Sequence, residues 1–446
     1  MWQYTPETEG DGVFHIPQTD PNVGFEQPLW NSEVVERIET EYPVFLSAVY
    51  EHLETNIPRS LMGFSDAFWP EESPLFPRHE VVQKYLECYA QDVLPLIRFA
   101  AQVRDVRPTP HGAWSVSVLD LRTQQQQVAT YDAVIVASGH YHTPYIPAIP
   151  GLAAWSAAHP GSVTHSKSYR SPAAFRNQKV AVIGAGPSGL DISRAIAGVC
   201  APPLLLSGSS AGAGAPPGDA RIAAAAALTR ADAASRTLHF GRGRAAAGVD
   251  AVLLCTGYEY ALPFLAGVRP APGADGRRVA HAYRHVFFVP APTLAFVALP
   301  RRVVPFPLAE AQAAVLARVY AGRLALPAAK DMERWEGEEL RRKGDVHRFH
   351  DLPFPEDALY INEFVDWAAE ASPRDGLEND GHGKKPLRWG EREFWMRARF
   401  AAIKAAFVGK GEGRVHVRTV EELGFAFEDA SDEKDKVDHK AQADGR

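Results

Sequence analysis

The sequence predicts an α/β fold that contains a parallel β-sheet, and three apolar runs support this prediction. Residues Asp132–Ala137, Lys179–Ile183 and Val249–Cys255 are almost continuously apolar, which is typical of strands covered on both faces. The second run leads into the glycine-rich stretch Gly184–Gly189 and then into a helical pattern over Leu190–Ala197. A strand, a glycine turn and a helix in this order indicate the start of a βαβ unit.

The composition excludes several classes of protein. The chain has 446 residues, with 46% hydrophobic and 23% charged residues, as in ordinary globular proteins, and this length suggests about three domains or subdomains. The net charge is 47 − 54 = −7, so no global basic field indicates nucleic acid as a partner. No apolar run is long enough to span a membrane, and Met1–Pro6 lacks the layout of a signal peptide. The three cysteines, Cys88, Cys200 and Cys255, contain no CxxC pair. We therefore expect a cytoplasmic protein with no metal site and no membrane partner.

Periodicity gives the order of the remaining elements. Helices are expected over 32–50, 78–89 and 308–320, strands over 101–106, 113–119 and 127–136, and short strands within 285–299. The Ala-, Gly-, Ser- and Pro-rich stretch 201–234 predicts a flexible insertion, with a short helix over 222–228. The charged residues 428–446 predict a disordered tail.

The glycine turn has the spacing and context of a dinucleotide-binding motif. In such a Rossmann-like unit, Gly184 permits the tight turn, Gly186 lets the backbone approach a pyrophosphate, and Gly189 lets the helix pack closely on the strand. The start of the helix attracts phosphates. Ser188 and Asp191, which we place in the first helical turn, are therefore expected at the cofactor.

The next strand carries information on which dinucleotide is bound. An NAD site usually has a carboxylate about 20 residues after the glycine turn. The stretch Leu204–Ser210 has none, which favours NADP, and Ser207 is the candidate contact. The next arginine is Arg221, so the sequence offers no obvious partner for a 2′-phosphate.

Further segments resemble the flavin-containing monooxygenase family. Gly161, His165 and Tyr169 match its motif FxGxxxHxxx(Y/F), with His159 in place of the phenylalanine. Similar matches to the family are the TNxP-type segment Thr55–Pro58, the two linker segments Ser138–Tyr141 and Cys255–Tyr258, and Pro305–Gln312. The resemblance covers nearly the whole chain and is closest to soluble fungal and plant members.

The resemblance implies two Rossmann-like dinucleotide-binding domains, of the type found in flavoprotein monooxygenases and disulfide reductases. The NADPH domain is inserted in the FAD domain, which predicts these parts: FAD domain 1–150, NADPH domain 151–257, FAD domain 258–427 and tail 428–446. The family also has an N-terminal GxGxxG unit for FAD, which this sequence lacks. Met1–Pro6 resembles a family segment that follows this unit, so we expect a chain truncated within the FAD domain.

The resemblance also implies an activity. NADPH reduces FAD, O₂ forms a C4a-hydroperoxyflavin, and one oxygen atom passes to nitrogen or sulfur of a small soft nucleophile, as in N,N-dimethylaniline monooxygenases. Asn56 is the catalytic candidate, because an amide orients ligands without a titratable proton. Trp2, Thr55 and Gln312 are the further flavin contacts, and a homodimer is the expected assembly.

Alternatives remain open at this stage. Asn56 could instead cap a turn before Pro58, and Gln312 could be an exposed helix residue. A Baeyer–Villiger enzyme would have Trp in place of Tyr169, and a disulfide reductase would need a CxxC pair. The alternative from another functional class is a truncated protein that binds NADP but has no oxygenase activity, because it lacks the FAD unit.

Overall fold

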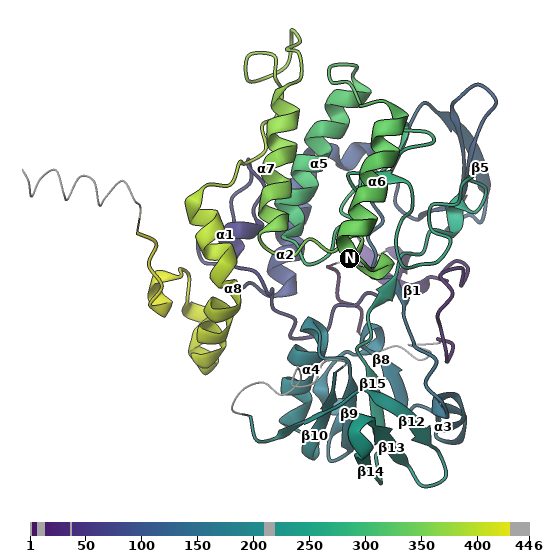
Figure 1. Ribbon diagram of the computed structural model, residues 1–446, viewed down its shortest axis with the longest axis vertical. Helices are drawn as coiled ribbons and strands as arrows, with labels where there is room; N and C mark the ends of the chain where they lie inside the picture. Colours follow the sequence, from purple (N-terminus) through teal and green to yellow (C-terminus); the bar gives the residue numbers. More distant parts are fainter. Residues whose placement is uncertain (1, 7–13, 36–37, 209–218, 429–446) are drawn as a thin grey trace, which may run out of the picture. The chain divides into compact units, whose positions relative to one another are not determined.

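The computed structural model describes residues 2–6, 14–35, 38–208 and 219–428. The chain divides into two compact units, which are described separately below (Figure 1). The first unit comprises Met1–Leu53, Ala90–Phe296 and Glu333–Phe349, and the second comprises Glu54–Tyr89, Val297–Met332 and His350–Arg446. The boundaries of the FAD and NADPH domains expected from the sequence stay a prediction, because the two units are defined by their internal packing and not by which cofactor they bind.

A five-stranded, wholly parallel sheet forms the centre of the first unit. The spatial order of its strands is β11-β10-β9-β15-β8, and the labels β8, β9, β10 and β15 mark it in the lower part of Figure 1. Their bounds are β8 Val163–His165, β9 Lys179–Ile183, β10 Ala201–Ser207, β11 Ile222–Ala225 and β15 Ala251–Leu254.

The chain winds outward from β9 in both directions. Helix α4 (Pro187–Ala197) carries it from β9 to β10, whereas β15 lies on the other side of β9. Ligands of such sheets bind at the carboxyl ends of the strands, where the winding direction changes. This switch point lies between β9 and β15.

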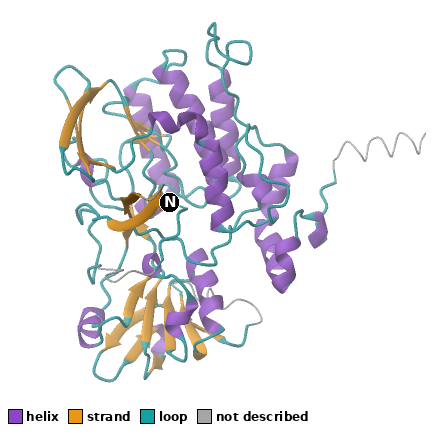
Figure 2. Cartoon of the chain, turned by 180° about the vertical axis from the view of Figure 1, so that it is seen from behind, coloured by secondary structure: helices purple, strands orange, loops and turns teal. Residues whose placement is uncertain are grey.

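Both faces of this sheet are covered, as the apolar runs predict. Val180 and Val182 of β9 belong to one buried cluster, and Ala181 and Ile183 belong to another. Alternate residues of a strand point to opposite faces, so β9 contributes to two separate cores. Figure 2 shows helices packed against the strands of this sheet.

The first unit also contains smaller sheets around the parallel one. One is antiparallel, with β3 Ala101–Pro108, β4 Trp114–Asp120 and β5 Gln126–Tyr131; another has the order β17-β18-β19-β6, with β17 Ala282–Tyr283, β18 Phe287–Phe288, β19 Leu294–Phe296 and β6 Val134–Val136. The others are β12 Leu228–Asp232, β13 Thr237–Phe240 and β14 Ala245–Ala246; the hairpin β1 Leu29–Val35 and β2 Ile38–Val44; and the pair β7 Thr143–Pro144 and β16 Tyr258–Glu259. Helix α3 covers Leu152–Ala158, with 3₁₀ turns η1 Gln91–Leu96, η2 Ser166–Ser168, η3 Pro172–Phe175, η4 Gly241–Gly243, η5 Pro263–Leu265 and η6 Val346–Arg348.

The second unit is helical in its described residues. Its helices are α1 Arg59–Met62, α2 His79–Tyr89, α5 Pro305–Tyr320, α7 Glu356–Ala369 and α8 Glu391–Gly409, followed by η7 Gly411–His416 and η8 Glu421–Leu423; α6 Ala329–Lys343 has residues in both units. Helices α7 and α8 are joined by a buried ion pair between Asp357 and Arg397, 2.6 Å apart. None of the described helices is long and apolar enough to cross a membrane.

Two expected helices are wrong. Residues predicted as a helix over 32–50 instead form the antiparallel hairpin that pairs Leu29 with Val44. β-branched residues favour strands, and Pro43 disfavours a helix interior, so helical spacing was the weaker signal there. The expected helix over 222–228 is strand β11, which adds to the parallel edge of β10.

Other elements need smaller corrections. The expected strand over 127–136 is two strands, β5 and β6, which belong to different sheets. The predicted flexible insertion over 201–234 is wrong where β10, β11 and β12 form; residues 209–218 and most of the predicted tail lie outside the described residues. The other expected elements are confirmed: helices over 78–89, 190–197 and 308–320, and strands over 101–106, 113–119, 179–183, 249–255 and within 285–299.

Candidate functional site

The turn after β9 requires glycine at its first position. Gly184 has a φ of +115°, and its N–H donates to the carbonyl of Ser207 at the end of β10 (2.8 Å). A Cβ atom at this position would lie 2.2 Å from the carbonyl oxygen of Cys255, which follows β15. A side chain here would clash, because the ends of β9 and β15 approach each other at the switch point.

The other two glycines serve different purposes. A Cβ on Gly189 would lie 1.8 Å from the carbonyl oxygen of Gly184, so this glycine lets the helix start against the turn. A Cβ on Gly186 would meet nothing within 4 Å. Gly186 therefore borders open space, which is where a backbone that receives a pyrophosphate has to be open.

Helix α4 begins beside this open space. Pro187 is its first residue, Gly186 precedes it, and no side chain caps it. The unpaired N–H groups and the dipole of a helix start favour an anion. Ser188 is exposed in this first turn, where its hydroxyl can also reach a ligand. The local geometry therefore fits a dinucleotide phosphate group.

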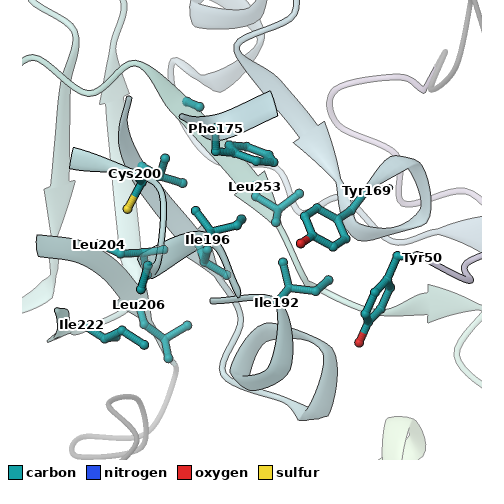
Figure 3. Packing of buried hydrophobic residues seen from close by; sticks show 14 residues of the cluster. Tyr50, Tyr169, Phe175, Ile192, Ile196, Cys200, Leu204, Leu206, Ile222 and Leu253 are labelled. Carbon is teal, nitrogen blue, oxygen red and sulfur yellow. The ribbon is translucent and has the colours of Figure 1, made fainter. Parts of the chain in front are cut away.

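Asp191 lies one turn further along α4, so its expected place in the first turn is wrong. Its carboxylate accepts a short hydrogen bond from the hydroxyl of Tyr50. Tyr50 is buried and packs edge-on against Tyr169, with ring centroids 5.3 Å apart (Figure 3). Burial, and then the charge of Asp191, raise the pKa of Tyr50, so the phenol keeps its proton and stays a donor.

The end of β15 and the residues after β8 complete the edge of the sheet. His165 is fully buried, and its Nδ1 accepts the N–H of Lys167 (3.1 Å). Burial lowers the pKa of His165 to about 4, so its ring is neutral at pH 7. Burial raises the pKa of the Cys255 thiol to about 12, which makes it a poor redox nucleophile.

Comparisons with known proteins agree with this geometry. Residues 39–213 match the model of the flavin-binding monooxygenase-like family, a range that includes the glycine turn. A flavin-containing monooxygenase of Arabidopsis thaliana, FMO GS-OX-like 2, is 31% identical over 422 residues, covering 89% of this chain and 80% of the relative. The chain belongs to the flavin-containing monooxygenase family.

Two more comparisons extend this result. The flavin-containing monooxygenase ustF1 of Aspergillus flavus is 31% identical over 342 residues, which cover 74% of this chain and 72% of the relative. The solved structure of S-allyl-L-cysteine S-oxygenase from Allium sativum has a TM-score of 0.73 and 26% identity, covering 95% of this chain and 88% of that one. The expected fold class, two Rossmann-like domains of a flavoprotein monooxygenase, is confirmed, and the family uses FAD and NADPH.

Two arginines of this flavin-containing monooxygenase, Arg221 and Arg244, lie at different edges of the parallel sheet. Arg221 immediately precedes β11, at the amino edge, and is held by Asp219 through contacts of 2.9 and 2.7 Å. Arg244 is exposed and donates to the carbonyl of Ala224, near the carboxyl end of β11 (2.9 Å). Arg244, which sequence reasoning missed, therefore lies at the carboxyl edge of the sheet, the edge that also carries the glycine turn.

Ser207 is less suited to contact a cofactor than expected. Its side chain is buried, and its hydroxyl donates to the carbonyl of Ala226 (2.8 Å). Its carbonyl accepts from Gly184. The carbonyl thus supports the glycine turn and the hydroxyl ties the end of β10 to the residue after β11, although Ser207 stands at the expected strand end.

The monooxygenase's TNxP segment begins the second unit. Thr55 is buried, and its hydroxyl donates to the carbonyl of Ile57 (2.9 Å). Asn56 is exposed, and its amide makes no hydrogen bond to any described residue. Pro58, not Asn56, precedes α1, so the structure shows no capping bond by Asn56. The segment is built so that Thr55 fixes the loop and Asn56 presents a free amide.

Gln312 is a buried residue, so its alternative interpretation as an exposed helix glutamine is wrong. Its Oε1 accepts the N–H of Ala298 (2.8 Å), and its Nε2 donates to the hydroxyl of Tyr360 (2.9 Å). Gln312 has no exposed surface, so its amide holds Ala298 and Tyr360 in place and presents no open group to a ligand. Trp2, in the first unit, is half-buried.

The two cofactors differ in how well the described residues fit them. For NADPH, the glycine turn, the start of α4 and Arg244 provide places for the phosphates. For FAD, the exposed amide of Asn56 suits the ring, whereas Gln312 is fully buried, and we assign no described residue to the pyrophosphate of FAD. Across the described ranges, no three His, Cys, Asp or Glu side chains gather as metal ligands.

Proposed function

We propose that this monooxygenase transfers one oxygen atom from O₂ to the sulfur of small thioethers, at the expense of NADPH. The glycine turn supports the proposal most directly, because its three positions have the open and closed spaces that a dinucleotide requires. Sulfur is favoured over nitrogen because the similar Allium sativum protein is an S-oxygenase. The reaction consumes thioether, O₂, NADPH and a proton, and yields sulfoxide, water and NADP⁺.

The protein's own residues bind and orient, while NADPH and FAD supply the hydride and the activation of O₂. Gly186 would receive the pyrophosphate of NADPH on a turn that Gly184 and Gly189 shape, and Arg244 would bind its 2′-phosphate. Asn56 orients the reacting groups through its free amide. None of these side chains has to transfer a proton, which agrees with a neutral, buried His165.

A protein that binds NADPH without oxygenase activity is the competing function. The two are distinguished by incubating the purified full chain with FAD, NADPH, ¹⁸O₂ and methyl phenyl sulfide. We expect a yellow protein with a flavin absorption band and a sulfoxide that carries one ¹⁸O atom. A colourless protein that binds NADPH but forms no labelled sulfoxide would contradict the proposal and support the competing function. A cytoplasmic location and a homodimer stay predictions.

A further inference from the structure

A cavity of about 510 Å³ opens within the first unit, and none of the residues assigned to the proposed function lines it. The N-terminal segment from Phe14 to Leu29 lines one side of it. The linker residues His142–Pro144 and the η2 residues Lys167 and Ser168 line the other. Its volume lies within the range of sites that take small molecules.

Several bonds fix the N-terminal segment over this cavity. The backbone of Gln18 pairs with Ile146 in both directions, at 2.9 and 2.8 Å. The Gln18 side chain is buried and donates to the carbonyl of Pro144 (2.7 Å). Further along, the carbonyl of Glu26 accepts from Gln102 (3.1 Å). The cavity is therefore bounded by hydrogen-bonded walls.

Opposite charges stand side by side in the lining. The Lys167 side chain is only 9% exposed, and its Nζ donates to Oε1 of Glu26 (2.9 Å) and to the carbonyl of His142 (2.7 Å). An ammonium has three N–H donors, so one remains. Oε2 of Glu26 has no partner among the described residues. Apolar side chains form much of the other lining: Phe14, Val23, Phe25, Leu29 and Leu46.

The cavity also lies near the nucleotide turn. Lys167 follows β8, whose last residue, His165, is in register with Leu254 of β15, and Leu254 is in register with Ile183 of β9. Adjacent strands are about 4.8 Å apart, so the two strand ends are roughly 10 Å apart. The carboxyl edge of the sheet thus carries both the glycine turn and the start of the segment that holds Lys167.

We propose that this cavity binds an α-amino acid with an apolar thioether side chain. The ammonium of the ligand contacts Glu26, its carboxylate contacts Lys167, and its side chain lies on the apolar wall. A zwitterion can contact both open positions, the remaining N–H of Lys167 and Oε2 of Glu26, and adds no net charge to the ion pair, whereas a ligand with one charge contacts only one of them and adds an unbalanced charge. This inference rests on the proposed function and narrows its substrates to S-substituted amino acids.

Binding of three related probes tests this assignment on the full chain without NADPH. By isothermal titration calorimetry, we expect L-methionine to bind at least tenfold more tightly than 3-(methylthio)propylamine or 3-(methylthio)propionate, which each lack one charge. Glu26→Gln should weaken binding of methionine and of the amine at least fivefold and should not weaken binding of the propionate, because Lys167 then keeps its full charge for the carboxylate. Equal binding of the three probes, or no saturable binding, would overturn the proposal.

Two further variants separate recognition from folding. Asp20→Asn makes the same change of charge in the same segment but outside the cavity lining, so it should change no affinity. Val23→Trp should fill the cavity and abolish methionine binding while the unfolding temperature is kept, because Val23 is 45% exposed. If Glu26→Gln lowers the unfolding temperature but keeps the same preference among probes, the ion pair is purely structural and the inference fails.

A failure of the cavity assignment can be distinguished from a failure of the proposed function. Binding of methionine without formation of its sulfoxide would contradict the proposed function alone. Sulfoxidation of thioethers with no preference for the zwitterion would contradict the cavity assignment alone.

Discussion

The hydroxyl of Tyr50 donates to the carboxylate of Asp191, which is 141 positions away in the sequence. This bond ties the chain shortly before the TNxP segment to the helix that begins at the nucleotide turn. Asp191 lies one turn after the start of α4, where we propose that the phosphates of NADPH bind, and the hydrogen bond from Tyr50 partly neutralises its carboxylate. The bond holds α4 in position and, under the proposed function, reduces the repulsion between Asp191 and the phosphates.

Removal of this hydroxyl should weaken NADPH binding. In Tyr50→Phe, the half-buried carboxylate of Asp191 loses its donor, which should cost about 1 kcal/mol of unfolding free energy. The dissociation constant of NADPH should rise several-fold, because the full carboxylate charge then faces the phosphates. Fluorescence titration with NADPH and urea unfolding measure both effects.

Addition of Asp191→Asn to this variant should restore NADPH affinity, because it removes the freed charge. If Tyr50→Phe matches the wild type in both measurements, the bond has neither of the two roles.

The second and third glycines of the turn, Gly186 and Gly189, should respond differently to alanine. Gly189→Ala should disrupt the start of α4 and lower the unfolding temperature, since its methyl group would meet the Gly184 carbonyl at 1.8 Å. Gly186→Ala should keep the unfolding temperature, since its methyl group meets nothing within 4 Å, yet weaken NADPH at least tenfold by filling the open space. Calorimetry and NADPH titration of both variants check this prediction. Tight NADPH binding by Gly186→Ala would show that the pyrophosphate does not bind beside Gly186.

The sequence predicted the glycine turn correctly because all of its determinants are local. The strand, the turn and the helix occupy the continuous stretch from Lys179 to Ala197, where spacing alone specifies the contacts. Even there, the pattern put Asp191 in the wrong turn, because the helix begins with Pro187.

Contacts between distant segments were not predictable from the sequence. No local pattern indicates that Tyr50 meets Asp191, or that Arg244, which lies between β13 and β14, returns to the carboxyl edge of β11. The burial of Gln312 depends on Tyr360, which lies on another helix. Such side chains acquire their roles only through tertiary packing.

Arg244 should decide the preference between the two nicotinamide cofactors. In Arg244→Gln, loss of a charge-assisted contact to the 2′-phosphate should weaken NADPH about tenfold and leave NADH, which lacks that group, unchanged. Arg221→Gln is the matched control, because Arg221 lies at the amino edge and is bound to Asp219. Steady-state KM values with both cofactors give the result, and an equal loss for NADPH and NADH in Arg244→Gln would exclude this role.

Asn56 should control how efficiently oxygen reaches the substrate. Asn56→Ala removes an exposed amide with no described hydrogen bond, so flavin content and unfolding temperature should stay close to those of the wild type. Release of hydrogen peroxide should rise relative to sulfoxide, since the reacting groups lose an orienting contact. A peroxide assay against NADPH consumption measures this ratio, and an unchanged ratio would remove Asn56 from the site. Thr55→Ala, which breaks an internal loop bond instead, should lower stability first.

His165 should make the fold sensitive to mild acid. Its pKa is about 4 in the folded chain and about 6.5 in an unfolded one, because burial favours the neutral ring. The unfolded chain therefore binds the proton first as the pH falls, so the stability from His165 is complete above pH 6.5 and decreases toward pH 4. At pH 5 the loss of unfolding free energy should be about 2 kcal/mol.

The variant His165→Asn tests this prediction. It keeps an acceptor for the N–H of Lys167 but does not titrate, so its unfolding free energy should change less between pH 7.5 and pH 5 than that of the wild type. Urea unfolding at the two pH values gives this difference, and parallel pH profiles for the two proteins would show that another group causes the acid sensitivity.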